Sequence, residues 1–144
     1  MELLHKMVPQ AMTVAFLSGT PSFISYKEQT SSILAAGRKL DLEVIVVECN
    51  SGRDFDAAFA TMDQRRAEAL ILGAFPLGPL DRVINLAARD RIPAIYTQRE
   101  NVIGGGLMSY GADLRDNLRQ VAIEYVGRIL KNERPADLPV QQST

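Results

Sequence analysis

Hydrophobic and polar positions follow two different spacings along the chain. Short apolar or β-branched runs end directly in polar or glycine-containing segments, a pattern that predicts buried strands. These runs cover residues 13–17, 42–47, 69–73, 94–96 and 107–109. Between the runs, apolar residues recur at intervals of three and four, which predicts amphipathic helices. The helices expected from this spacing cover residues 2–8, 25–40, 55–62, 80–87 and 114–129.

Local signals mark several ends of these elements. Ser25 and Glu28 have the spacing of a capping box, in which each side chain bonds the other residue's backbone N–H at a helix start. Pro9 ends the first helix, and Asp113 can cap the last one. The triplet Gly104–Gly106 lies between a short helical turn and a strand. We interpret it as a turn, because a dinucleotide fingerprint would follow a strand and open a helix.

Strands that alternate with helices predict the fold class. This order is typical of βαβ units and therefore of a parallel sheet with helices on both faces. With right-handed crossovers, the simplest arrangement is an α/β fold with a flavodoxin-like, doubly wound sheet of about five strands. Ligands of such sheets bind beyond the carboxyl ends of the strands. The candidate loops are residues 18–24, 48–52, 73–77, 96–100 and 109–113.

The loop after the fourth predicted strand combines the side chains that an amino-acid ligand requires. Arg99 could bind a carboxylate, Glu100 an ammonium group, and Tyr96 could stack on an apolar side chain. Thr97 and Gln98 add neutral hydrogen-bonding groups. The alternative is an ordinary solvated helix start, where such charges are common. On the residues alone, these two interpretations have equal weight.

Two other strand ends carry candidate contacts. Ser18 and Thr20 offer hydroxyl groups after the first strand, although a plain turn explains each of them at least as well. Tyr110 follows the fifth strand and could line a cleft, or it could be a half-buried ring with a solvated hydroxyl group. Ser18, Thr20 and Tyr110 therefore join the list of candidate ligand-binding residues.

Composition and charge exclude several classes of function. The chain has 144 residues, 47% hydrophobic and 23% charged, as expected for one globular domain. Its net charge is −1, and no basic cluster exceeds Arg65-Arg66, so we predict no nucleic-acid binding. Its apolar runs are far shorter than the roughly 20 residues of a membrane span, so no membrane insertion is predicted. With a single histidine, His5, and a single cysteine, Cys49, no metal centre, cofactor or enzymatic activity is predicted.

Three segments carry a resemblance to a known family. They are VPQAMTVAFLSG, IPAIYTQRENVIGGGLMSYGADL and YVGRILKNERPADLPVQQST. They resemble the second lobe of ABC-transporter solute-binding proteins of the tryptophan/tyrosine-binding type, which have a periplasmic binding protein type I-like fold. The resemblance implies a remnant of the inter-lobe helix and linker at residues 1–10, the second lobe at 11–132 and an extended crossover tail at 133–144.

The resemblance also implies a function. One wall of a cleft would close over a small, amino-acid-like solute by hinge motion, with Glu100 at the acidic position of the family's loop. Many relatives carry Asp-Pro where this sequence has Ala74-Phe75-Pro76. Loss of that carboxylate puts ammonium recognition there in doubt and leaves Phe75 as a candidate stacking wall.

Partners and compartment follow from the same resemblance. The expected partners are a small solute, a missing first lobe and, in the full-length protein, an ABC permease. The family is periplasmic, whereas this chain as written lacks a leader and would stay in the cytoplasm. A homodimer through the orphaned inter-lobe surfaces is a further hypothesis.

A stand-alone flavodoxin-like sensory or cofactor-binding domain is the alternative. A receiver domain would need a phosphoacceptor aspartate after the third strand, where this chain has Gly73-Ala74. A flavin module would need a phosphate-binding first loop, which residues 18–22 imitate in part.

Overall fold

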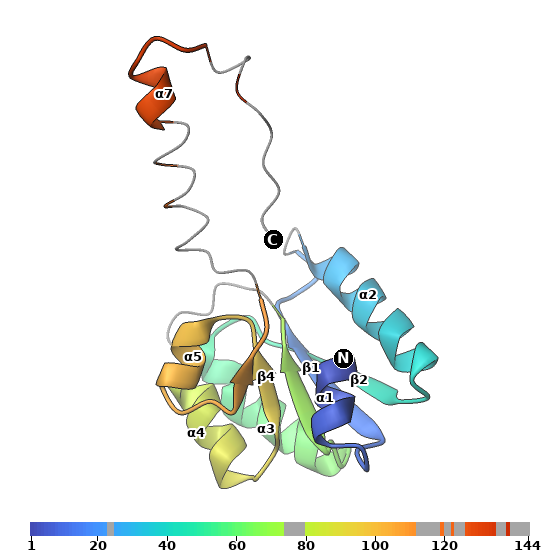
Figure 1. Cartoon of the computed structure of the whole chain (residues 1–144). Helices are drawn as coiled ribbons and strands as arrows, with labels where there is room; N and C mark the ends of the chain where they lie inside the picture. The colour runs from blue at the N-terminus through green and yellow to red at the C-terminus, as the bar shows by residue number, and fades with distance from the viewer. Residues whose placement is uncertain are drawn as a thin grey trace. The chain divides into compact units, whose positions relative to one another are not determined.

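The structure is a computed structural model, and it describes residues 1–22, 25–73, 80–111, 119, 122, 126–134 and 138. The chain divides into two compact units, Met1–Tyr110 and Gly111–Thr144, which we describe separately (Figure 1). Phe75, Asp113 and most of the predicted terminal helix and tail lie outside the described residues. The divisions expected after residues 10 and 132 stay predictions.

A five-stranded parallel sheet forms the centre of the first unit. Its order is β2-β1-β3-β4-β5, the flavodoxin-like order, so the predicted fold class is confirmed. Each strand lies within one or two residues of the apolar run that predicted it. The strands are β1 (Thr13–Ser18), β2 (Glu43–Glu48), β3 (Ala69–Leu72), β4 (Ala94–Tyr96) and β5 (Met108–Ser109).

The helices of this unit also follow the predicted spacing. They are α1 (Glu2–Met7), α2 (Tyr26–Lys39), α3 (Phe55–Gln64), α4 (Asp81–Arg89) and α5 (Arg99–Ile103), and a 3-10 turn, η1 (Gly52–Asp54), precedes α3. The four apolar residues that predicted α3 are all buried: Phe55, Ala58, Phe59 and Met62. The candidate loop at residues 96–100 is shorter than predicted, because β4 includes Tyr96 and α5 already begins at Arg99.

Alternate residues of each strand enter different hydrophobic layers, because side chains of a strand point to opposite faces in turn. On one face α3 and α4 pack against Ala15, Leu17, Leu70 and Leu72. On the other face α1 and α2 pack against the strand residues between these, including Phe16 and Ile71 (Figure 1). Helices therefore cover both faces of the sheet, as predicted.

Helix α1 packs against the sheet of the first unit. Leu4 of α1 is only 1% exposed and lies in the layer that also contains Val14 and Ile95. Leu3 and Met7, the other large apolar residues of this helix, are 40% and 42% exposed. Because a two-turn helix offers one narrow stripe to the sheet, only part of its apolar surface is covered.

The second unit contains α7 (Gly127–Ile129) among its described residues. Ala122 and Ile129, expected on the buried face of the terminal helix, are both exposed. No apolar layer among the described residues of this unit covers them, so the burial predicted for these two positions is not observed. Among the helices of the described residues, none combines the length and hydrophobicity that crossing a bilayer requires.

Candidate functional site

The carboxyl ends of the strands meet along one edge of the sheet, which we call the rim. Backbone hydrogen bonds continue one residue beyond the strands there: Cys49 N–H donates to Ser18 O, Gly73 N–H to Leu17 O and Tyr110 N–H to Tyr96 O, each at 2.8 Å. The register places Ser18 beside Glu48 and Tyr96 beside Ser109. Loops that are distant in sequence are thereby held side by side on a rigid base.

The first turn of α2 contributes polar side chains to the rim. Gln29 Nε2 donates to Ser25 Oγ at 2.5 Å, and Ser25 makes no side-chain bond to the helix backbone. The predicted capping box is therefore wrong. The Ser25 backbone has the near-helical angles φ −89° and ψ 0° rather than the extended conformation typical of such caps. The Ser25 hydroxyl group therefore accepts from Gln29 instead of from the helix backbone.

A second contact joins α2 to the end of β2. Tyr26 Oη donates to Glu48 Oε1 at 2.5 Å. This hydrogen bond to a carboxylate raises the pKa of the Tyr26 phenol, since it stabilises the protonated form. The start of α2 is thus joined to the β2 end of the rim.

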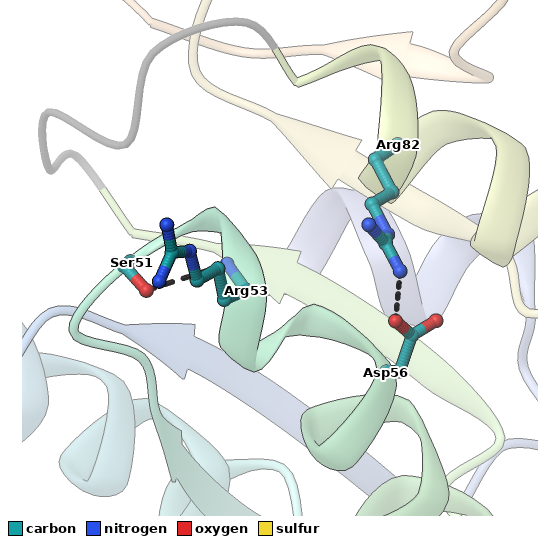
Figure 2. A network of polar contacts seen from close by, with 4 residues as sticks. All are labelled: Ser51, Arg53, Asp56 and Arg82. Carbon is teal, nitrogen blue, oxygen red and sulfur yellow. Dashed lines mark hydrogen bonds and ion pairs between the residues drawn. The ribbon is translucent and has the colours of Figure 1, made fainter.

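The loop after β2 is held by its own polar groups. Asp54 Oδ2 accepts from the backbone N–H groups of Asn50 and Ser51, both at 2.9 Å, and Arg53 N–H donates to Ser51 Oγ at 3.3 Å. Figure 2 shows Ser51 and Arg53 beside a separate ion pair between Asp56 of α3 and Arg82 of α4. That pair is more than half exposed, so it contributes little to stability.

Cys49, in the same loop, is an unreactive thiol. It is 1% exposed, and burial raises its pKa to about 11, with the nearby Asp54 carboxylate adding to the shift. A thiol with this pKa stays protonated at neutral pH and is a poor nucleophile.

Two adjoining cavities lie at the rim on the α1–α2 face of the sheet. The rim cavity has a volume of about 430 Å³, and the helix cavity has a volume of about 410 Å³. Both volumes fall in the range typical of small-molecule sites. The rim cavity is lined by Phe16, Glu28, Gln29, Ser32, Ile33, Ile71, Leu72, Gly73 and Thr97. The helix cavity shares Ile33, Ile71, Leu72 and Thr97 and adds Met1, Glu2, Leu3, Ala36, Ile95, Tyr96 and Tyr110.

Two sequence-predicted residues lie at these cavities with accessible side chains. Thr97 is half-buried and lines both cavities. Tyr110 is 71% exposed and lines the helix cavity. The structure therefore brings these two residues together beside an apolar floor, as a solute site requires.

Tyr96 has a different position from the one expected. It contributes to the wall of the helix cavity, but it is only 1% exposed and belongs to the core layer with Val83 and Ile84. Burial raises the pKa of its phenol to about 12. The ring is therefore not open in this structure, because strand alternation points it to the α3–α4 face while Ile95 points to the cavities. A ligand contact at Tyr96 stays a prediction.

Four other predicted residues, all within the described ranges, line neither of the two cavities. Arg99 and Glu100 are exposed in the first turn of α5, as in the alternative interpretation of that loop, and neither lines a described cavity. Ser18 is 2% exposed, and Thr20 shares a 2.8 Å hydrogen bond with Ser22. The sequence alone could not tell which of these side chains line a cavity, because exposure depends on neighbours that are distant in the chain.

Sequence reasoning missed the contribution of α2. Glu28, Gln29 and Ser32 line the rim cavity, and Ile33 forms part of both floors. The spacing of Ser25 and Glu28 was interpreted only as a helix start. The sequence therefore gave no indication that Glu28 lines a cavity beside β3. Within the described ranges, no group of three His, Cys, Asp or Glu side chains is placed to hold a metal ion.

Comparisons with known proteins identify a family and agree with the fold. The sequence model of the family described as "ABC transporter substrate binding protein" matches residues 1–144. Among curated proteins, none matches.

Several solved structures share the fold. One is an ABC domain in complex with L-Trp from Streptococcus pneumonia, with a TM-score of 0.79 and 22% identity over 97% of this chain and 47% of that one. A conserved domain protein from Vibrio cholerae has a TM-score of 0.79 and 18% identity, over 97% of this chain and 47% of that one. A substrate binding protein with adhesive properties from Clostridium difficile, in a ligand-free, open structure, has a TM-score of 0.68 and 21% identity. That match covers 99% of this chain and 48% of the other. The chain thus spans about half the length of these proteins.

Proposed function

Because the chain belongs to the family of ABC transporter substrate binding proteins, we propose that its rim forms one wall of a cleft that binds a small solute. The observation that carries this proposal is the pair of adjoining cavities at the carboxyl ends of a parallel sheet, with an apolar floor and converging polar groups. The family consists of binding proteins rather than enzymes, so the rim is proposed to bind and not to catalyse.

We infer that the solute is amino-acid-like. The L-Trp complex of a protein with the same fold supports this class, at 22% identity. In this chain the floor of Ile33, Ile71 and Ile95 suits an apolar side chain, and Thr97 and Tyr110 offer hydrogen bonds beside it. Ser18, Thr20, Phe75, Arg99 and Glu100 remain proposed contacts for the closed cleft.

The wider context is proposed on the same basis. The chain would form the second of two lobes, the other lobe would close on the solute by hinge motion, and the loaded protein would deliver the solute to an ABC permease outside the cytoplasm. With one lobe, half of the desolvating contacts are absent, so we expect affinities in the millimolar range. A homodimer through the inter-lobe surfaces is also proposed, and light scattering that finds a dilute monomer would exclude it.

Methyl NMR of the chain tests the solute site directly. With isoleucine δ1 methyl groups labelled, Ile33, Ile71 and Ile95 report on the cavities, and Ile45, which is buried in the α3–α4 layer, serves as the control. Titration with individual amino acids is expected to shift the first three resonances and to leave Ile45 in place. Apolar and aromatic amino acids should give larger shifts than serine or glycine.

Two results would contradict the proposal. One is that no amino acid shifts the cavity resonances at the highest soluble concentration. The other is that Ile45 shifts as much as Ile71, since that would indicate nonspecific association with the whole unit. A yellow purified protein with flavin absorbance would favour the cofactor-binding alternative instead.

A further inference from the structure

We propose that Glu28 and Gln29, neighbours in the first turn of α2, bind an amine group of the solute. This inference rests on the proposed solute site and adds the group that its polar side recognises. Both residues line the rim cavity, whose remaining wall includes the apolar side chains of Phe16, Ile33 and Ile71. An ammonium group attached to an apolar body would match this distribution of charge.

Charge is the first argument for an amine. Glu28 is the one ionisable side chain among the described residues that line the rim cavity. The other polar lining groups, Gln29, Ser32 and Thr97, are neutral. A carboxylate group of a solute would meet a like charge on this wall, whereas an ammonium group would meet an opposite one.

The second argument is that Glu28 is not committed to the helix start. In a capping box its carboxylate would accept from the Ser25 N–H, but the structure forms no such box. Within the described residues, the Glu28 carboxylate makes no hydrogen bond or ion pair, and the side chain is exposed at the cavity wall. Glu28 is therefore available to an incoming cation.

Gln29 supplies an oriented acceptor beside it. Its Nε2 donates to Ser25 Oγ at 2.5 Å, which directs Oε1 towards the end of β3. A Cβ atom added at Gly73 would lie only 2.9 Å from Oε1, so the amide oxygen occupies the space directly above that glycine. A carbonyl oxygen at this place can accept from an N–H group but cannot donate to a carboxylate.

A structural role alone could also explain an acidic residue here. Glutamate in the first turn of a helix is stabilised by the helix dipole, whether or not a ligand binds. The two explanations differ in their consequences. Loss of a purely structural charge changes stability, whereas loss of a ligand contact changes the preference for amines over neutral analogues.

Three probes of similar shape separate these explanations: phenethylamine, 2-phenylethanol and 3-phenylpropanoate. We expect the Ile33 and Ile71 methyl resonances of the full chain to respond most strongly to the amine and least to the carboxylate. In Glu28→Gln the affinity for the amine should fall about fivefold, as for a charge pair in contact with water, while the response to the alcohol stays unchanged. Gln29→Leu should weaken amine binding in the same direction.

Asp63→Asn is the matched control, because Asp63 is exposed on α3 and lines neither of these two cavities. This variant removes one negative charge and should leave the amine affinity unchanged. The inference is overturned if Glu28→Gln binds the amine as the unmodified chain does, or if the carboxylate binds as well as the amine. It is also overturned if amino acids shift the two methyl resonances and the probes do not, and then the proposed function still stands. If neither amino acids nor probes shift them, both proposals fail.

Discussion

Substitution by alanine at each position of the triplet Gly104–Gly106, between α5 and β5, is predicted to change the free energy of unfolding by a different amount. At Gly106, an added Cβ atom would lie 2.7 Å from Asn101 O and 2.7 Å from Tyr96 Cε2. The first atom belongs to the backbone and the second to a buried ring, so neither can move easily. Gly106→Ala should therefore destabilise the unit by about 1–3 kcal/mol, the usual cost of overpacking.

The other two glycines differ in backbone conformation and free space. Gly105 has φ of 105°, and its nearest non-neighbouring atom would be 3.7 Å from an added Cβ. Gly105→Ala should cost about 1–2 kcal/mol through backbone strain alone. At Gly104 the nearest such atom would be 3.5 Å away and φ is −75°, so Gly104→Ala should be neutral or stabilising by up to about 1 kcal/mol.

Urea unfolding followed by far-UV circular dichroism measures all three variants. The expected order of transition midpoints is Gly104→Ala highest, then Gly105→Ala and Gly106→Ala, with the slope of the transition unchanged. Equal midpoints for the three variants would refute the packing of this turn against Tyr96. A Gly104→Ala variant less stable than Gly106→Ala would refute it as well.

Three further predictions concern the cavities, the core and pH. Thr97→Ala should reduce the shifts that amino acids cause at Ile71 without lowering stability, whereas Thr61→Ala, at an exposed position of α3, should leave the titration unchanged. Met62→Ala, at a position with 0% exposure, should lower the free energy of unfolding by about 2–5 kcal/mol, and Met12→Ala, at 54% exposure, by far less in the same urea assay. Hydrogen bonds from the Met12 and Thr13 N–H groups lower the pKa of Glu68 below its ordinary 4.5, so its contribution to stability is present above pH 4.5 and is lost as the pH falls through the folded pKa. Glu68→Gln should therefore make acid unfolding less steep below pH 4.5, and an unchanged acid transition would contradict this.

The sequence was sufficient to predict the fold because its pattern repeats over the whole chain. Apolar runs located β1 to β4 within one or two residues, since buried strands of a parallel sheet need apolar side chains on both faces. Helical spacing located α2, α3 and α4 for a similar reason. The family resemblance was confirmed over residues 1–144.

The site was predicted less well, because its residues are set by contacts between distant segments. Every residue of β4 is apolar or aromatic, so the sequence could not tell that Ile95 faces the cavities and Tyr96 the opposite layer. At the start of α2, the spacing of Ser25 and Glu28 indicated a local capping box. Ser25 instead accepts from Gln29, whose side-chain oxygen lies beside Gly73 at the end of β3, more than forty residues later in the chain.

The two edge strands of the sheet, β2 and β5, differ in how they resist pairing with a strand of another chain. β5 pairs over two residues, so it offers almost no free backbone to an intruding strand. β2 is six residues long, but Glu43 and Glu48 place a negative charge at each of its ends. A second strand added along β2 would have to desolvate these ends, including the ion pair between Glu43 and Arg65, and this cost protects the sheet from growing into aggregates.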